Sequence, residues 1–104
     1  MEVRWSPEAA ADFTSIVQYI RQDNPSAALR VARAIYNAIA QLNIFPNRGR
    51  SGRIDGTREL PLANLPFVVV YRVRENAVEI VRLLHGAHAG RRQASESEAS
   101  KFQT

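Results

Sequence analysis

The chain contains no cysteine. This absence excludes disulfide bonds, thiolate nucleophiles and cysteine-ligated metals, and it fits the reducing environment of a cytoplasm. Long hydrophobic runs are missing as well, because no stretch approaches the roughly 20 apolar residues of a membrane-spanning helix. The first 20 residues carry the charged side chains Glu2, Arg4, Glu8 and Asp12, so no secretory signal is expected. We therefore expect a cytoplasmic protein that does not enter a membrane.

Lysine is almost absent, since Lys101 is the only one among the 14 basic residues and the other 13 are arginine. With ten acidic residues the net charge is +4. Two explanations of the arginine content compete: a preference for planar phosphate or carboxylate partners, and codon bias in a GC-rich genome. The count alone does not separate them, so the positions of the arginines must decide.

The first half of the chain predicts a short strand and two helices. After a strand over residues 3–5, Ser6 is a capping residue, Pro7 suits a first helical turn and Glu8 faces the positive end of the helix dipole. Apolar residues at helical spacing then predict a helix over about 7–22. Asn24 and Pro25 repeat the start signal for a second helix, whose apolar stripe continues until Pro46. Two helices joined by about three residues should form a hairpin.

The second half predicts a sheet. Residues 47–53 are typical of a loop rich in glycine and arginine, and strands are predicted over 57–62, 67–74 and 78–85. The predicted fold class is α+β, with the N-terminal helical hairpin packed on one face of a small, mainly antiparallel sheet. The other face should need a partner, because the central strands carry apolar residues on both sides. We expect one domain over residues 1–88 and a polar tail over 89–104.

The densest group of charges lies in the predicted loop and the strand after it. Four arginines fall within eleven residues and are opposed only by Asp55 and Glu59; they are Arg48, Arg50, Arg53 and Arg58. Three glycines between them, at positions 49, 52 and 56, would let the backbone approach a partner closely. The cluster predicts docking on phosphate or on an acidic partner; the alternative is a solvated loop.

Two further arginines lie in the last strand pair, where the register depends on the turn. A two-residue turn places Arg72 opposite Glu79 and puts Arg82 on the face of the apolar residues of its strand. A three-residue turn places Arg72 and Arg82 on one face, and Tyr71 with His85 on the other. A cross-strand ion pair is the structural explanation of Arg72, whereas Arg82 has no evident local partner.

Histidine offers the only titratable group near neutral pH. His85, at the end of the last strand, suits a general acid or base; the alternative is a strand-end histidine bonded to backbone. His88 follows three residues later, but without cysteine or an acidic cluster we expect no metal. The glycine pattern also lacks the strand and helix of a nucleotide-binding fingerprint, so no cofactor is expected.

Several segments, in this order and spacing, resemble the ParE/RelE superfamily of bacterial toxins over residues 3–88. They begin with Trp5-Ser6-Pro7-Glu8-Ala9, pass through residues 42–46, 49–53, 56–60 and 66–73, and end with residues 81–86. The resemblance implies a toxin encoded beside a cognate antitoxin that wraps the toxin's sheet and helices as a hetero-oligomer. Strand addition and helix-in-groove docking are the physical modes of such wrapping. We expect Phe67, Val69 and Tyr71 to contact the antitoxin.

The superfamily has two activities. RelE-like members are similar to ribosome-dependent endoribonucleases that cut messenger RNA, a reaction in which Arg58 and Arg82 would stabilise the phosphate and His85 would move a proton. ParE-like members poison DNA gyrase without a recognised catalytic set. In either case we expect Arg50, Arg53, Arg58 and Arg82 to meet the target. The single lysine and the residues Leu84-His85-Gly86, with which the resemblance ends, favour the ParE-like alternative.

Overall fold

The structure, a computed structural model, describes residues 1–86. The elements in chain order are β1 (Glu2–Trp5), α1 (Pro7–Asp23), α2 (Pro25–Ala40), the 3-10 turn η1 (Gln41–Asn43), β2 (Arg50–Ser51), β3 (Arg58–Pro61), β4 (Phe67–Val73) and β5 (Ala77–His85). His88 and the predicted polar tail over 89–104 lie outside the described residues. No helix within residues 1–86 is long and apolar enough to cross a membrane.

Both helices begin where the capping residues predict. The Ser6 hydroxyl accepts a hydrogen bond from the Ala9 amide at 2.9 Å, and the Asn24 side chain accepts one from the Ala27 amide at 3.1 Å. The second helix is shorter than predicted, because α2 ends at Ala40 and its last turn tightens into η1. Leu42 in η1 still reaches the core, which explains why the apolar stripe continued beyond the helix.

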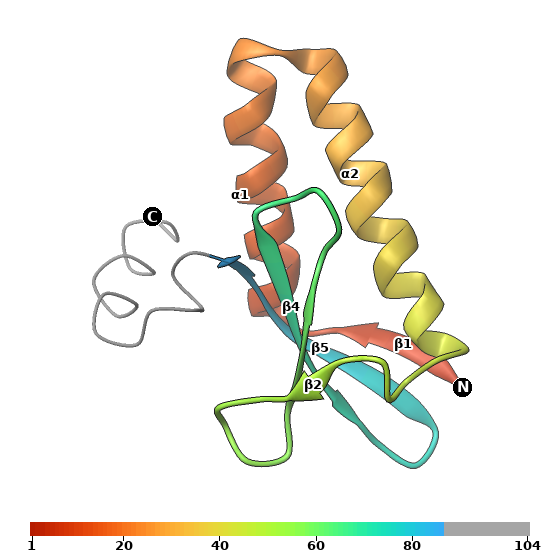
Figure 1. The fold of residues 1–104 in the computed structure, drawn as a ribbon. Coiled ribbons are helices and arrows are strands. Elements are labelled where there is room, and N and C mark those ends of the chain that lie inside the picture. Colours follow the sequence, from red (N-terminus) through yellow and green to blue (C-terminus); the bar gives the residue numbers. More distant parts are fainter. Residues whose placement is uncertain (87–104) are drawn as a thin grey trace.

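The sheet is mixed, with strand order β1-β5-β4-β3-β2. All neighbours are antiparallel except β1, which runs parallel to β5. The helices form a hairpin on one face, as Figure 1 shows, so the predicted α+β class is confirmed. The predicted loop over residues 47–53 contains the short edge strand β2, whose formation the sequence did not indicate because its side chains are polar and have no alternating pattern.

The core lies between the helical hairpin and one sheet face. Its fully buried side chains come from both layers; the largest are Ile35, Ile39, Leu42, Val69, Tyr71, Val78, Ile80 and Leu83. Val68 and Val70 alternate with these on β4 and so point to the other face. They lie outside the core cluster although only 4% and 5% of their surface is exposed.

A β-bulge in β5 decides the register that the sequence left open. Arg74 donates its amide to the Ala77 carbonyl at 2.7 Å across a two-residue turn, and Arg72 lies opposite Glu79 as the shorter turn requires. The Glu79 carboxylate forms its ion pair with Arg74, at 3.1 Å. Between Val70 and Tyr71 the pairing then shifts by one residue, which leaves Val81 without an opposite residue on β4. Arg82 therefore turns to the face of Arg72. This is the arrangement that the longer turn would have produced.

Candidate functional site

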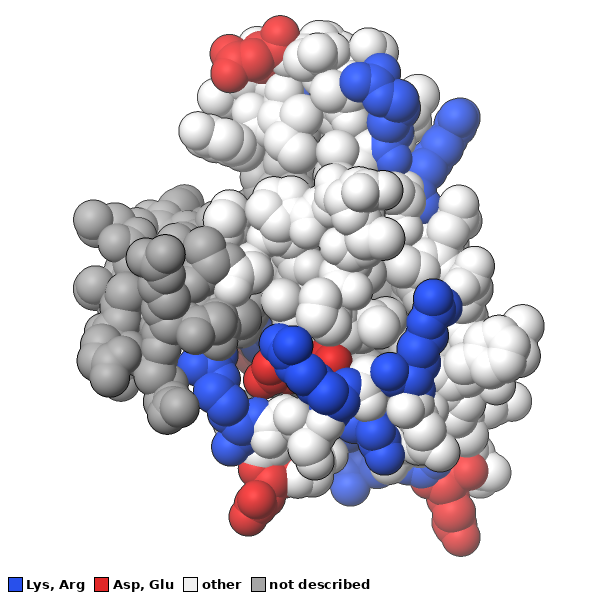
Figure 2. Space-filling view, viewed as in Figure 1, with Lys and Arg blue, Asp and Glu red and all other residues white. Residues whose placement is uncertain are grey.

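A row of charged side chains crosses the sheet face that the helices do not cover. Residues paired across adjacent strands share a face, and the pairing aligns Arg50 of β2, Glu59 of β3, Val70 of β4 and Arg82 of β5. Figure 2 shows basic side chains gathered over the strands in the lower half of the view, with acidic ones between and below them. Arg50 and Arg82 thus lie on the face without helices.

Glu59 positions two of the arginines that the sequence singled out. Only 8% of its side chain is exposed, and its carboxylate lies 3.5 Å from Arg50 and 3.7 Å from Arg53. It also accepts a hydrogen bond from the Arg53 amide at 3.3 Å. Both guanidinium groups remain partly exposed. One buried negative charge therefore holds two positive side chains at the surface, with one charge in excess.

Arg58 binds backbone carbonyl groups, whereas Arg50 and Arg53 lie beside Glu59. It pairs with Tyr71 and not with Val70, so it belongs to the opposite set of side chains. Its guanidinium donates hydrogen bonds to the carbonyl oxygens of Gly49, at 2.7 Å, and Asn47, at 3.4 Å. Arg58 thus ties the segment before β2 to β3, and these bonds leave it less available to a target than Arg50.

The glycines were expected to let the backbone approach a partner closely. At two of the three glycines, the group that approaches closely belongs to the protein itself. A side chain at Gly49 would meet the Tyr71 ring and hydroxyl, and one at Gly52 would meet Thr57. Only Gly56 faces open space, and it adopts a left-handed φ of 81° in the turn. Gly49 and Gly52 therefore allow the loop to pack closely against the rest of the protein, and only Gly56 leaves its backbone open to a partner.

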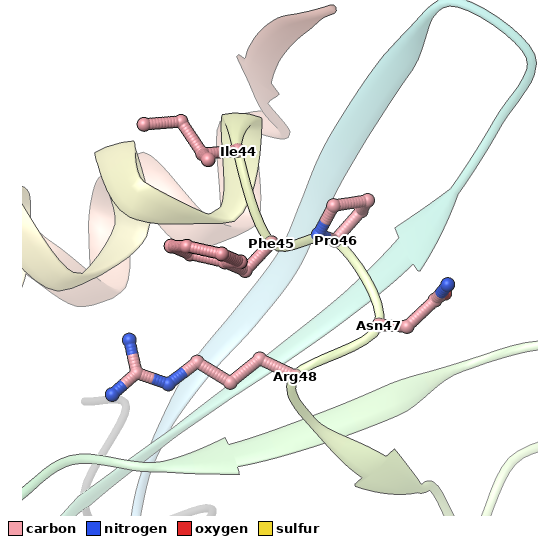
Figure 3. A pocket seen from close by; sticks show the side chains of 5 residues that line it. All are labelled: Ile44, Phe45, Pro46, Asn47 and Arg48. Atoms are coloured by element: carbon pink, nitrogen blue, oxygen red, sulfur yellow. The ribbon is translucent and has the colours of Figure 1, made fainter.

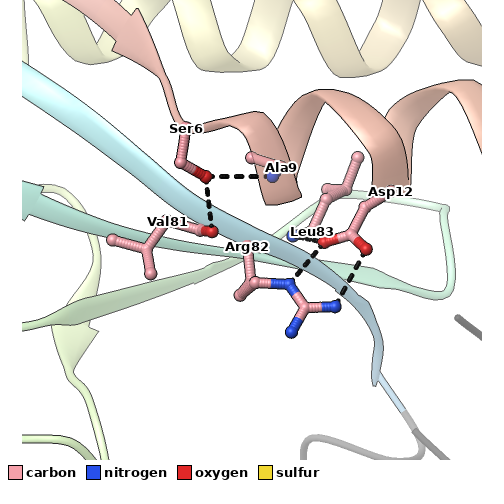
Figure 4. A network of polar contacts seen from close by, with 6 residues as sticks. All are labelled: Ser6, Ala9, Asp12, Val81, Arg82 and Leu83. Atoms are coloured by element: carbon pink, nitrogen blue, oxygen red, sulfur yellow. Dashed lines mark hydrogen bonds and ion pairs between the residues drawn. The ribbon is translucent and has the colours of Figure 1, made fainter. Parts of the chain in front are cut away.

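Arg82 has a partner that is distant in sequence. Its guanidinium donates two hydrogen bonds to the Asp12 carboxylate of α1, at 2.7 and 2.9 Å (Figure 4). Asp12 also accepts a hydrogen bond from the Leu83 amide at 2.9 Å. This amide follows the part of β5 that pairs with β1. The hydrogen bond to Asp12 raises the pKa of Arg82, with desolvation acting in the opposite direction.

His85 lies at the other end of the sheet from Arg58. It pairs with Phe67, and the two rings meet edge to face with centroids 5.8 Å apart. Tyr71, the partner of Arg58, lies four positions beyond Phe67 on β4, a distance of about 13 Å along a strand. Arg82 points to the opposite sheet face from both. The three residues proposed for RNA cleavage therefore do not converge on one point.

Relatives with a similar sequence are named as toxins. The family described as "ParE toxin of type II toxin-antitoxin system, parDE" matches residues 3–90. The chain belongs to this ParE toxin family. Toxin RelE2 of Caulobacter vibrioides is 40% identical over 86 residues, covering 83% of this chain and 96% of the relative. Y4kP of Sinorhizobium fredii is 41% identical over 83 residues, covering 80% and 85%.

A solved structure agrees with the sequence relatives. The chromosomal ParDE toxin-antitoxin system from P. aeruginosa contains a chain that matches with a TM-score of 0.73 and 28% identity, covering 80% of this chain and 92% of the other. The predicted resemblance is thus confirmed. The chain is a type II toxin of the ParE/RelE superfamily, and toxins of this type pair with an antitoxin.

The side chains predicted to meet the antitoxin lie inside this ParE-family toxin. Val69 and Tyr71 have no exposed surface and Phe67 has 6%, and all three pack in the core under the helices. Strand alternation puts Val68 and Val70, and not these three, on the face without helices, and a contact of the three with the antitoxin stays a prediction. Phe67 alone also lines a surface hollow.

That hollow is a groove of about 670 Å³ between the helical hairpin and one end of the sheet. Its lining includes Tyr19, Ile20, Val31, Leu65 and His85, and none of the described residues that line it is Asp, Glu, Lys or Arg. The groove has the apolar character that a helix packed against the toxin would require.

Two acidic residues of this toxin were missed by the sequence reasoning. Asp12 shares the buried face of α1 with Ala9 and Ile16, at spacings of three and four residues. A carboxylate within an apolar helical stripe is the signal that could have revealed a buried partner for a distant arginine. Glu59 gave no such signal, because its burial depends on the arrival of β2 beside β3.

Proposed function

We propose that this toxin inhibits DNA gyrase in the cytoplasm and that its cognate antitoxin neutralises it. The observation that carries the choice of gyrase is the separation of Arg58, Arg82 and His85 described above. Cleavage of RNA requires a proton-transferring group and phosphate-stabilising charges around one phosphate. A protein that binds gyrase needs a shaped and charged surface but no such constellation.

The contact with gyrase is assigned to Arg50 and Arg53, which together are termed the arginine row. Arg50 and Arg53 are exposed at their guanidinium groups and are oriented by Glu59, as a preorganised contact with an acidic surface requires. Arg58 and Arg82, also predicted to meet the target, are assigned supporting roles, because each is held by groups of the toxin itself. The antitoxin is assigned to the largely apolar groove between the hairpin and the sheet.

Purified toxin incubated with gyrase, ATP and supercoiled DNA is expected to accumulate cleaved DNA. The His85→Ala variant should retain most of this activity, since a gyrase inhibitor does not use His85 as an acid or base. Addition of the protein encoded beside the toxin should abolish the effect. The measurement is the fraction of linear DNA after denaturation of gyrase, with His85→Ala and wild type compared at equal soluble concentration.

A ribosome assay tests whether the toxin instead cleaves messenger RNA. Messenger RNA cleaved at defined codons by wild type, and left intact by His85→Ala or Arg82→Ala, would assign the toxin to the RelE-like nucleases instead. Arg82→Ala must be compared at a temperature where it remains folded, because its ion pair with Asp12 supports the structure.

Neutralising the arginine row is expected to weaken gyrase inhibition at least about tenfold, as is typical for charged contacts that face a partner. The variant combines Arg50→Gln and Arg53→Gln with Glu59→Gln, so that no buried carboxylate is left without a partner. Inhibition is measured as the toxin concentration for half-maximal DNA cleavage. Arg30→Gln combined with Arg33→Gln, on the exposed surface of α2, is the matched control. Equal inhibition by the two variants would show that the row is a solvated surface only.

A further inference from the structure

Two large apolar side chains are presented to solvent between η1 and β2. Ile44 is 68% exposed and Phe45 is 58% exposed. They precede Pro46 and Arg48 around a shallow hollow of about 630 Å³ lined by residues 44–48 (Figure 3). Single exposed apolar side chains are ordinary on a protein surface. Two adjacent ones directly after η1 require an explanation.

Hydrogen bonds hold this segment in place at both ends. At its start the Phe45 amide donates to the Gln41 carbonyl at 3.0 Å, and the Arg48 side chain donates to the Gln41 side chain at 3.0 Å. At its end the Tyr71 hydroxyl donates to the Pro46 carbonyl and accepts from the Gly49 amide, each at 2.8 Å. The apolar pair is therefore held outward by the core, and it would lose little conformational freedom on binding.

The charges around the pair indicate the chemistry of its partner. Residues 44–53 contain Arg48, Arg50 and Arg53 and no acidic residue. Arg50 and Arg53 are the two arginines that Glu59 orients. A complementary surface has an apolar pocket ringed by carboxylates.

The position of the segment separates it from the groove assigned to the antitoxin. The groove reaches Phe67 and His85 at one end of the β4–β5 pair, whereas the segment is bound to Tyr71, four residues further along β4. The groove is largely apolar and the segment is basic. The two surfaces therefore favour partners of different chemistry.

We propose that Ile44 and Phe45 are the anchor with which the toxin docks on gyrase, inserting into an apolar pocket ringed by acidic side chains. This inference rests on the proposed function and adds the contact that provides affinity. Anchors of this kind, central and rimmed by charge, contribute most of the binding energy in protein interfaces.

Binding of purified toxin to immobilised gyrase tests the anchor. The double variant Ile44→Ala/Phe45→Ala is expected to bind at least about 30-fold more weakly than wild type. Leu29→Ala, which removes a 53% exposed side chain from α2, should change binding less than about twofold. Arg48→Glu should slow association, and added salt should slow association of the wild type as well.

A parallel measurement with the protein encoded beside the toxin separates the possible outcomes. The double variant should bind that protein within about twofold of the wild-type affinity, since hot-spot losses are confined to the interface that contains them. An equal loss for both partners would assign the segment to the antitoxin and overturn the anchor. Wild-type binding to gyrase with an unimpaired double variant would overturn the anchor alone. No binding of wild type to gyrase would overturn the proposed function as well.

Discussion

Asp12→Ala is expected to lower the free energy of unfolding by about 3 kcal/mol, a large share of the stability of a small domain. The carboxylate accepts two hydrogen bonds from Arg82 and one from the Leu83 amide. Its removal leaves a half-buried guanidinium without its counter-charge and a buried amide without an acceptor, each of which costs free energy. Urea denaturation followed by circular dichroism measures the loss.

Two companion variants test the reason for this loss. Glu75→Ala, in the exposed turn between β4 and β5, should change the free energy of unfolding by less than about 0.5 kcal/mol. Combining Asp12→Ala with Arg82→Met should recover part of the loss, because the unpaired charge is removed together with its partner. If Asp12→Ala alone costs less than about 1 kcal/mol, water satisfies these groups and α1 is not anchored through this carboxylate.

Tyr71→Phe is the second large effect, expected to cost about 2 kcal/mol. The substitution keeps the ring in the core but removes the hydroxyl that bonds both Pro46 and Gly49. It should also accelerate hydrogen exchange at the Arg48 and Gly49 amides, because the segment before β2 is no longer tied to the sheet. If this segment carries the anchor, gyrase binding should weaken more than the global loss of stability explains.

Gly49→Ala should disturb the same contact, that between Gly49 and the Tyr71 hydroxyl. A methyl group there would lie 2.7 Å from the Tyr71 hydroxyl oxygen and 3.0 Å from the Glu59 carbonyl oxygen, so a loss of about 1–3 kcal/mol is expected. Its effect should not add to that of Tyr71→Phe, since both disturb one contact. Tyr36→Phe, at a 60% exposed tyrosine, is the control. Exchange rates that are equal in Tyr71→Phe and Tyr36→Phe would show that the hydroxyl does not hold the segment.

The elements with local signals could be predicted from the sequence. Ser6 and Asn24 cap the helices through hydrogen bonds to amides three residues away, and such contacts depend on neighbouring residues alone. The apolar spacing of α1 and α2 likewise reports the helical period of 3.6 residues. The β-branched residues of β4 and β5 favour strands. The helical hairpin, the antiparallel strands and the family resemblance all followed from patterns of this kind.

The roles of the arginines depended on contacts that no local pattern contains. Arg82 changes face because Val81 bulges, and at that bulge the Ser6 hydroxyl donates to the Val81 carbonyl at 2.9 Å across 75 residues. Arg50 and Arg53 became a positioned pair only when β2 brought them beside Glu59. The formation of the helices and central strands therefore followed from local patterns in the chain. Which charges meet depended on strand register and helix docking, because these bring together residues that are far apart along the chain.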